Sequence, residues 1–236
     1  MRQNIAPGID VIRAGNPSPM TLEGTNSYVL RAPGAAAAVV IDPGPNDPAH
    51  LDALAATGPI EAILLTHGHP DHAAGAAPLS AATGASIRAG EVVHAGGFDI
   101  EVIPTPGHTA DSVCFAVPQA VLTGDTILGR GSSVLGEYDG ALRDYLGSLH
   151  RLAGFAGRLG LPGHGPALPD LGAACGQYIA HRRERIEQVR AALAELGEDA
   201  PSEQIVRRIY ADTDPGLWPA AEHSVDATRQ FLRAGG

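Results

Sequence analysis

Residues 66–72 have the sequence Thr66-His67-Gly68-His69-Pro70-Asp71-His72, in which three histidines and one aspartate follow the apolar residues 60–65. The apolar run predicts a strand buried on both faces, and α/β sheets place their chemistry on loops beyond the carboxyl ends of such strands. His67 and His69 can point to one side of an extended segment, whereas Pro70 favours the first turn of a helix that carries Asp71 and His72. The stretch therefore predicts two adjacent pairs of metal ligands at one strand end.

The types of ligand indicate a hydrolytic metal pocket rather than a closed structural site. Neutral imidazole nitrogens suit zinc, copper, iron or nickel, and a neighbouring carboxylate favours a dizinc or di-iron pocket. A structural zinc site would more often use pairs of cysteines, but the two cysteines of this chain, Cys114 and Cys175, lie far apart in the sequence. The alternative is that the histidines are solvated loop residues that hold no metal.

Length and composition predict one α/β domain with an appendage, or two small domains, because 236 residues with 44% hydrophobic content can fill a sizeable core. The first residues lack the apolar run of a signal peptide, and no segment has the roughly 18 apolar residues of a membrane span. We therefore expect a cytoplasmic protein without a membrane anchor. The net charge of -10 argues against general attraction to nucleic acid or anionic membranes.

Three later segments, residues 105–109, 122–126 and 161–165, repeat the arrangement of an apolar strand followed by a glycine and a metal-ligand type. The glycine precedes His108, Asp125 and His164, and it permits a backbone that passes close to a metal. Asp42 ends an earlier apolar strand, where such a carboxylate can orient a ligand histidine. An Asx-turn is the alternative role for Asp42.

Hydrophobic periodicity and turn residues predict alternating strands and helices, then a mainly helical end of the chain. Strands are expected over residues 24–30, 36–42, 60–65, 86–89, 98–104, 112–117, 120–123 and 159–161. Helices are expected over residues 48–57, 70–82, 139–155, 171–196, 201–210 and 217–232. The apolar face of the helix over residues 171–196 is expected to cover either the chain's own sheet or a second subunit.

The whole set of ligands resembles the metallo-β-lactamase superfamily, whose H-x-H-x-D-H motif matches His67, His69, Asp71 and His72. The resemblance covers about residues 9–166 and implies a four-layer αβ/βα sandwich with two divalent metal ions, most often Zn²⁺. It implies that the first metal is held by His67, His69 and His108, the second by Asp71, His72 and His164, and that Asp125 bridges them.

Residues 124–134, 161–166 and 178–184 look like the β-lactamase-like protein 2 group within that superfamily. This resemblance implies a hydrolase domain over residues 1–169, followed by a long helix and a small, mainly helical winged-helix-like region over residues 170–236. The chain ends at Gly236, soon after the last expected helix, so we expect the β-wing to be short or missing.

The resemblance implies a hydrolase in which a hydroxide that bridges two metals attacks an ester-type bond. Asp71 is expected to orient the hydroxide and then pass a proton to the leaving group. Some relatives in the group cleave single-stranded RNA, and thioester hydrolases of the hydroxyacylglutathione type share the same ligands, so an anionic or ester-type substrate of either kind is expected. A binding module for nucleic acid or another partner, with a structural metal site, is the alternative of another class. Asp125 counts against antibiotic hydrolysis, because dizinc β-lactamases usually have cysteine there.

Substrate contacts are predicted at Arg130, Ser132 and Ser133, on a glycine-flanked loop just beyond Asp125, where they can meet a phosphate or carboxylate. An exposed loop arginine is the alternative for Arg130. Cationic residues also gather on the long helix, and nearby glutamates favour a solvated, ion-paired face there over an anion-guiding one. These cationic residues are His181, Arg182, Arg183 and Arg185.

Overall fold

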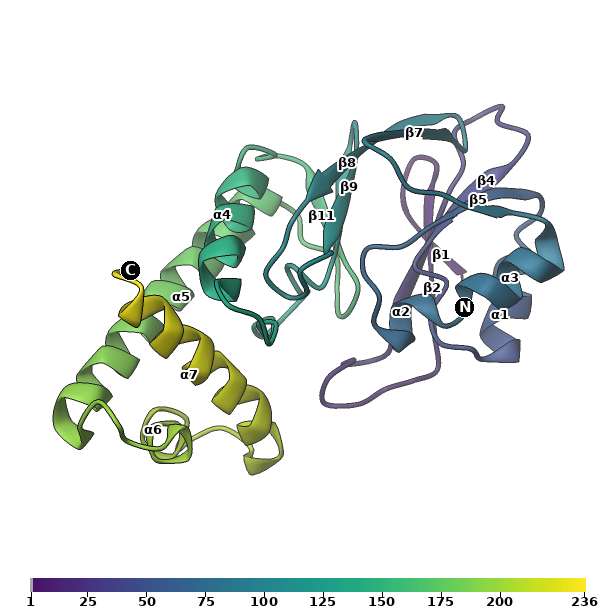
Figure 1. Cartoon of the computed structure of the whole chain (residues 1–236). Coiled ribbons are helices and arrows are strands. Elements are labelled where there is room, and N and C mark those ends of the chain that lie inside the picture. The colour runs from purple at the N-terminus through teal and green to yellow at the C-terminus, as the bar shows by residue number, and fades with distance from the viewer. Residues whose placement is uncertain (1) are drawn as a thin grey trace.

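Two β-sheets pack face to face in the N-terminal part of the protein, which comprises the residues before helix α5 (Leu171–Leu196), and the computed structural model describes residues 2–236 (Figure 1). The first sheet has six strands in the order β1-β2-β3-β4-β5-β6: Arg2–Ala6, Ile9–Arg13, Asn26–Leu30, Ala38–Ile41, Ile60–Leu64 and Ser86–Ile87. The second has five strands in the order β11-β10-β9-β8-β7: Leu159–Pro162, Ala120–Gly124, Val113–Val117, Phe98–Pro104 and Val92–Ala95. Strands β4, β5 and β6 are parallel, as are β10 and β11, and the other pairs are antiparallel.

Helices cover the outer face of each sheet, which produces four layers. Helices α1 (Pro48–Ala55) and α3 (Ala76–Thr83) share a hydrophobic cluster with the first sheet, and α4 (Ala141–Ala153) and α5 (Leu171–Leu196) share one with the second. A third cluster, which includes Leu64, Phe115 and Leu122, fills the space between the sheets. The predicted αβ/βα sandwich is thus confirmed, since each sheet buries one face on its partner and the other on helices.

The predicted helix over residues 70–82 is wrong in detail, because the chain forms two helices there: α2 (Pro70–Ala73) and α3. Gly75 separates them, and its backbone nitrogen donates to the carbonyl of Gly44 at 2.9 Å. A Cβ on Gly75 would lie 2.9 Å from the carbonyl oxygen of Pro43 and 2.8 Å from Leu51 Cδ2. The helix is interrupted where the chain presses against the loop after β4.

The sequence analysis also missed three strands, β1, β2 and β7. Strands β1 and β2 form an antiparallel hairpin around Pro7 and Gly8, and Gly8 has a left-handed φ of 74°. A Pro-Gly pair between two short alternating runs is a turn signal that could have identified this hairpin.

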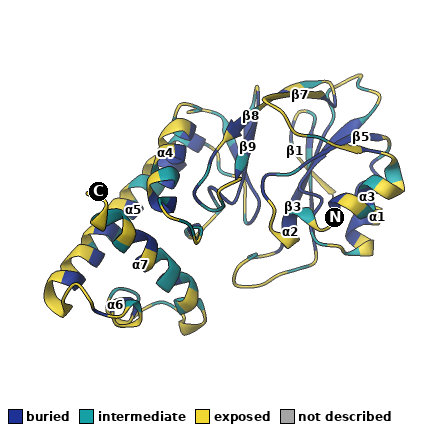
Figure 2. Cartoon of the chain, viewed as in Figure 1, coloured by how far each residue is buried: buried dark blue, intermediate teal, exposed yellow. Residues whose placement is uncertain are grey.

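Helix α5 connects the N-terminal part to the C-terminal helices (Figure 2). Its first half packs with α4, whereas Val189, Ala192 and Leu193 pack against α6 (Ser202–Ile209) and α7 (Trp218–Arg233). A 3₁₀ helix, η1 (Pro215–Leu217), precedes α7. The apolar face of α5 therefore covers its own chain, and the described residues 163–236 contain no strand.

Both cysteines, Cys114 and Cys175, are buried and free. Within residues 2–236, none of the helices combines the length and the apolar character that crossing a bilayer requires.

Candidate metal centre

Seven side chains from five segments meet at one edge of the two sheets. His67 and His69 follow β5, Asp71 and His72 lie on α2, and the remaining three follow strands of the second sheet. These three, His108, Asp125 and His164, come after β8, β10 and β11. The structure thus brings together all seven residues that the sequence singled out, in three overlapping groups: His67, His69, His108; His67, His72, Asp125; and Asp71, His72, His164.

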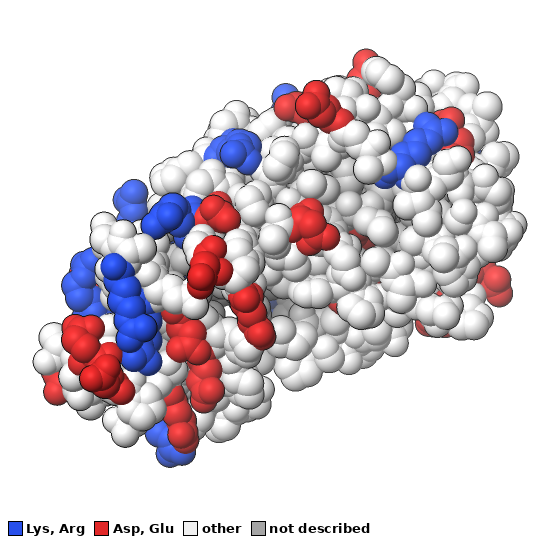
Figure 3. Space-filling view, in the orientation of Figure 1, with Lys and Arg blue, Asp and Glu red and all other residues white. Residues whose placement is uncertain are grey.

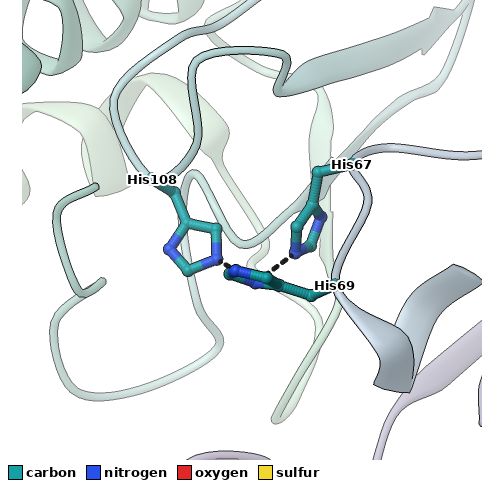
Figure 4. Close-up of side chains that lie close together, drawn as sticks. All are labelled: His67, His69 and His108. Carbon is teal, nitrogen blue, oxygen red and sulfur yellow. Dashed lines mark hydrogen bonds between the residues drawn. The ribbon is translucent and has the colours of Figure 1, made fainter. Parts of the chain in front are cut away.

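Three imidazole nitrogens converge in the first group (Figure 4). His69 Nδ1 lies 3.0 Å from His67 Nε2 and 2.9 Å from His108 Nε2. The opposite nitrogens are occupied: His108 Nδ1 donates to the Val134 carbonyl at 2.8 Å, and His67 Nδ1 lies 3.0 Å from Thr66 Oγ1. Because nitrogens bound to one zinc ion at about 2.0–2.1 Å lie only slightly further apart, this triad has the geometry of one side of a tetrahedral site.

The second group lies next to the first. His164 Nε2 is 3.2 Å from His72 Nε2 and 3.1 Å from Asp71 Oδ2. Asp125 lies between the two groups, with its Oδ1 3.5 Å from His72 Nε2 and its Oδ2 3.3 Å from His164 Nε2 and 3.9 Å from His108 Nε2. This placement allows one carboxylate to face two metal positions.

Asp42 holds the histidines from behind. Its Oδ2 lies 2.8 Å from His72 Nδ1 and accepts the Thr66 hydroxyl at 2.6 Å, while its Oδ1 accepts the Thr66 backbone N–H at 2.8 Å. Since the Thr66 oxygen in turn contacts His67 Nδ1, one carboxylate orients a histidine of each group, the role predicted for it. Asp42 has a left-handed φ of 51°, a conformation that aspartate tolerates better than most residues.

Burial and charge divide the histidines into two kinds. Burial lowers the pKa of His67 to about 3 and also lowers the pKa of His108, so both are neutral ligands at pH 7. Burial opposes protonation of His72 and His164 as well, but the carboxylates of Asp125, Asp42 and Asp71 outweigh it. They raise the pKa of His72 well above its usual value and that of His164 to about 9.

The residues fit a divalent transition metal. Asp125 Oδ1 is buried and has no hydrogen-bond partner among the described residues, although a buried carboxylate oxygen normally has one. A cation between the histidine groups would satisfy that oxygen together with the converging nitrogens. Imidazole with carboxylate suits zinc or iron better than magnesium or calcium, which prefer oxygen ligands.

The glycines before the later ligands serve different purposes. Gly107 and Gly124 have φ values of 145° and 50°, which favour glycine. Gly163 has no such conformation, but a Cβ there would lie 2.5 Å from His72 Cε1 and closer still to Asp125 Oδ1. Gly163 is therefore needed for space beside the ligands.

We expect Gly163→Ala to lose at least one bound metal per chain, because the added methyl group would displace His72 or Asp125. Elemental analysis of the purified variant measures this directly. Gly176→Ala on α5 is the matched control, since a Cβ there would meet no atom within 4 Å, and it should keep the metal content of the parent protein. Full metal content in Gly163→Ala would show that the close contact relaxes without cost.

The three predicted substrate contacts lie outside the metal cluster and differ from one another. Arg130 is exposed and forms an ion pair with Glu23, and Ser132 is half-buried. Ser133 is buried, and its hydroxyl donates to the Thr126 carbonyl at 3.1 Å. The Ser133 hydroxyl therefore supports the loop, and all three residues line one cleft outside the metal cluster.

The cationic stretch of α5 is not uniformly solvated. Arg183 is exposed, but Arg182 is 4% exposed, and its guanidinium donates to the Ser133 carbonyl and stacks on the Tyr145 ring at 5.0 Å. The predicted solvated face is thus wrong for Arg182. Arg182 lies three residues after Ile179 and four before Ile186, so helical spacing places it on the apolar face of α5, and this signal could have separated it from Arg183.

The fold and the site together define an αβ/βα sandwich with a candidate dinuclear metal centre at the edge of its sheets. Residues 20–95 match the family described as Metallo-beta-lactamase superfamily, and residues 202–228 match the Beta-lactamase associated winged helix domain. The Beta-lactamase-like protein 2 homolog of Drosophila melanogaster is 30% identical over 247 residues, which cover 89% of this chain and 82% of that protein. The chain belongs to the metallo-beta-lactamase superfamily.

Other relatives extend this comparison. The Lactamase-like protein adaB of Aspergillus niger is 35% identical over 206 residues, covering 77% of this chain, and this chain spans 62% of the length of adaB. A Beta-lactamase domain protein from Burkholderia ambifaria has the same fold, with a TM-score of 0.79 at 23% identity over 100% of this chain and 88% of that one. A crystal structure described as a di-iron-bound form is 29% identical with a TM-score of 0.52, over 69% of this chain and 94% of that one.

Proposed function

We propose that the protein is a two-metal hydrolase that cleaves an ester-type bond. The observation that supports this most directly is the position of Asp125 between two groups of histidines, with a buried oxygen that has no hydrogen-bond partner among the described residues. A structural metal site would be closed by its protein ligands. Here His69 is exposed and Asp71 is 28% exposed, so solvent and substrate can reach the centre.

The proposed ligands are His67, His69 and His108 for one ion and Asp71, His72 and His164 for the other, with Asp125 between them. When bound, two divalent ions would supply an acidified water and would stabilise negative charge on the reacting oxygens. The chain orients its own ligands through Asp42, Thr66 and the Val134 carbonyl. Zinc is the proposed metal, and the relative in a di-iron-bound form makes iron the comparison to test.

Asp71 is the proposed proton carrier. It is the more exposed of the two carboxylates in the cluster, and Thr25 Oγ1 lies 3.5 Å from its Oδ2. Its pKa is lowered, because hydrogen bonding and charge from His164 and His72 outweigh burial, which would raise it. Asp71 is therefore ionised at pH 7 and able to accept a proton at the edge of the site.

Two classes of substrate are proposed, a single-stranded RNA phosphodiester and a thioester. The match of residues 202–228 to a winged helix domain supports RNA. The distribution of charge supports the thioester. On the face shown in Figure 3, basic and acidic side chains are mixed over the C-terminal helices. Within the C-terminal helices, Arg207 pairs with Glu203, and Arg208 pairs with Glu195 of α5. Such pairing works against a continuous basic track for a polyanion.

The experiment that tests the proposal compares a labelled single-stranded RNA with an S-acyl thiol ester, using protein of measured metal content. We expect one of them to be hydrolysed by the parent protein and to survive with Asp71→Asn. RNA cleavage would assign a nuclease, and thioester cleavage would assign a small-ester hydrolase. Two bound metals with neither activity would contradict the hydrolase proposal and favour the binding module.

A further inference from the structure

We propose that a cleft between the N-terminal part and the C-terminal helices binds an oxyanion, carboxylate or phosphate, carried on an apolar portion of the substrate. The inference rests on the proposed function, whose substrate class it narrows to small amphipathic anionic esters or thioesters. It arises from a cavity and a group of cationic side chains that lie outside the metal cluster.

The cleft has a volume of about 540 Å³, within the usual range of sites for small molecules. Three parts of the chain line it: the loop before β3, the loop after β10, and the helices α5 and α7 with the segment between α6 and α7. The cleft therefore exists only because the C-terminal helices stand beside the loops of the N-terminal part.

Arg182 is the central observation. Its side chain lines the cleft, is 4% exposed, and has a buried Nε without a hydrogen-bond partner among the described residues. The partners of its guanidinium are the Ser133 carbonyl and the Tyr145 ring, neither of which carries a charge. A buried cation without a counter-ion is unfavourable, and an anionic ligand in the cleft would compensate it.

Two further side chains, His181 and Arg185, line the same wall. Burial and the neighbouring arginines lower the pKa of His181, so Arg185 carries the charge. Arg185 donates to Gln188 Oε1 at 2.8 Å, lies 3.4 Å from His181 Nε2 and stacks on Tyr210 at 4.5 Å. None of these partners is a carboxylate.

The glutamates that had predicted an ion-paired face are engaged elsewhere: Glu187 pairs with Arg190, and Glu184 accepts the Gln188 amide. Arg130, at the other wall, is balanced by Glu23. The cleft thus carries net positive charge on its α5 wall.

Another part of the lining is apolar. Met20, Leu22, Leu128 and Leu217 contribute to it, and Met20 remains 51% exposed. Leu22 has a left-handed φ of 56°, a strained conformation for a leucine that is most often found at functional sites. A lining that combines apolar and cationic side chains suits a ligand with both an apolar portion and an anionic group.

Val134 links the cleft to the metal centre. It lines the cleft, and its carbonyl accepts the hydrogen bond that orients His108. A substrate held in the cleft would therefore lie beside the proposed ligands. Tyr210 is the aromatic ring in the lining, whereas proteins that hold single-stranded RNA usually stack successive bases on several such rings, so the lining favours the small anionic ligand.

The test measures binding by calorimetry to the metal-loaded protein, with octanoate and octyl phosphate as anionic probes and octanol as the neutral probe. We expect at least one anion to bind ten times or more tightly than octanol, and the tighter of the two identifies the headgroup. Arg185→Gln should weaken that anion about tenfold or more, as expected for a lost hydrogen bond to a charged group. Arg183→Gln, an exposed neighbour on the same helix, should change it less than about twofold.

Arg182→Gln should weaken binding of the anion at least as much as Arg185→Gln. Its melting temperature shows whether the variant folds. If it does not fold, Arg185→Gln alone provides the test. Equal binding of octanoate, octyl phosphate and octanol would overturn the inference. Equal losses of anion affinity in Arg185→Gln and Arg183→Gln would also overturn it, because they would place the anion at the metals or on the surface. Displacement of the bound anion by single-stranded oligouridylate, sensitive to Arg185→Gln, would assign the cleft to RNA instead. Binding is measured without turnover. Its result therefore tests the cleft independently of whether the protein hydrolyses the RNA or the thioester.

Discussion

Asp71→Asn is expected to reduce kcat by at least about 100-fold while both metals remain bound, because the loss of a positioned proton carrier typically costs about 10²- to 10⁴-fold. Asparagine keeps the shape of the side chain, and its amide oxygen can still face His164, which lies 3.1 Å from Asp71 Oδ2. It cannot accept a proton. The measurement is kcat and KM on whichever substrate the parent protein cleaves, together with the metal content of the variant.

Asp52→Asn is the matched control, because it also replaces a carboxylate by an amide, but at an exposed position of α1, outside the metal cluster. It should leave kcat unchanged. Near-parental kcat in a fully metallated Asp71→Asn would rule out the role of Asp71 in proton transfer, whereas a loss of activity that follows a loss of metal would make it a ligand only.

Removal of the metals by a chelator is expected to lower the melting temperature by about 5–10 °C. A ligand at 100 times its Kd stabilises the folded state by about 2.7 kcal/mol, and each kcal/mol shifts the melting temperature of a chain of this size by about 2–4 °C. Differential scanning calorimetry before and after chelation, and after zinc is restored, measures the difference.

The stabilisation by metal should increase as the pH rises from 6 to 9. The raised pKa of His164, about 9, means that this nitrogen holds a proton in the metal-free protein below that pH, and the metal must displace it. Protonation of His164 therefore favours the metal-free form at low pH. This competition with the metal is lost as the pH rises through 9. Gly163→Ala, in which metal binding should already be impaired, should show a smaller difference at every pH. A melting temperature that chelation does not change would contradict a metal centre at these residues.

Much of the fold could be predicted from local patterns. The apolar runs that became β4, β5, β9 and β10 are short and bounded by glycine or proline, so their existence and approximate limits follow from the chain itself. The hairpin β1–β2 was missed because polar residues interrupt its strands. The interruption at Gly75 was missed because it depends on a contact with Gly44. Contacts between distant segments are not visible in the periodicity of either segment.

The candidate site divides in the same way. The sequence by itself determined which residues can hold metal, because histidine and aspartate have ligand atoms that their neighbours lack. The glycines beside them mark where the backbone can pass close to a metal. Tertiary structure alone decided which histidines Asp42 orients, that Ser133 turns inward, and that Arg182 is buried while Arg183 is exposed. The direction of a side chain depends on what packs against its backbone, and those partners come from strands and helices far away in the chain.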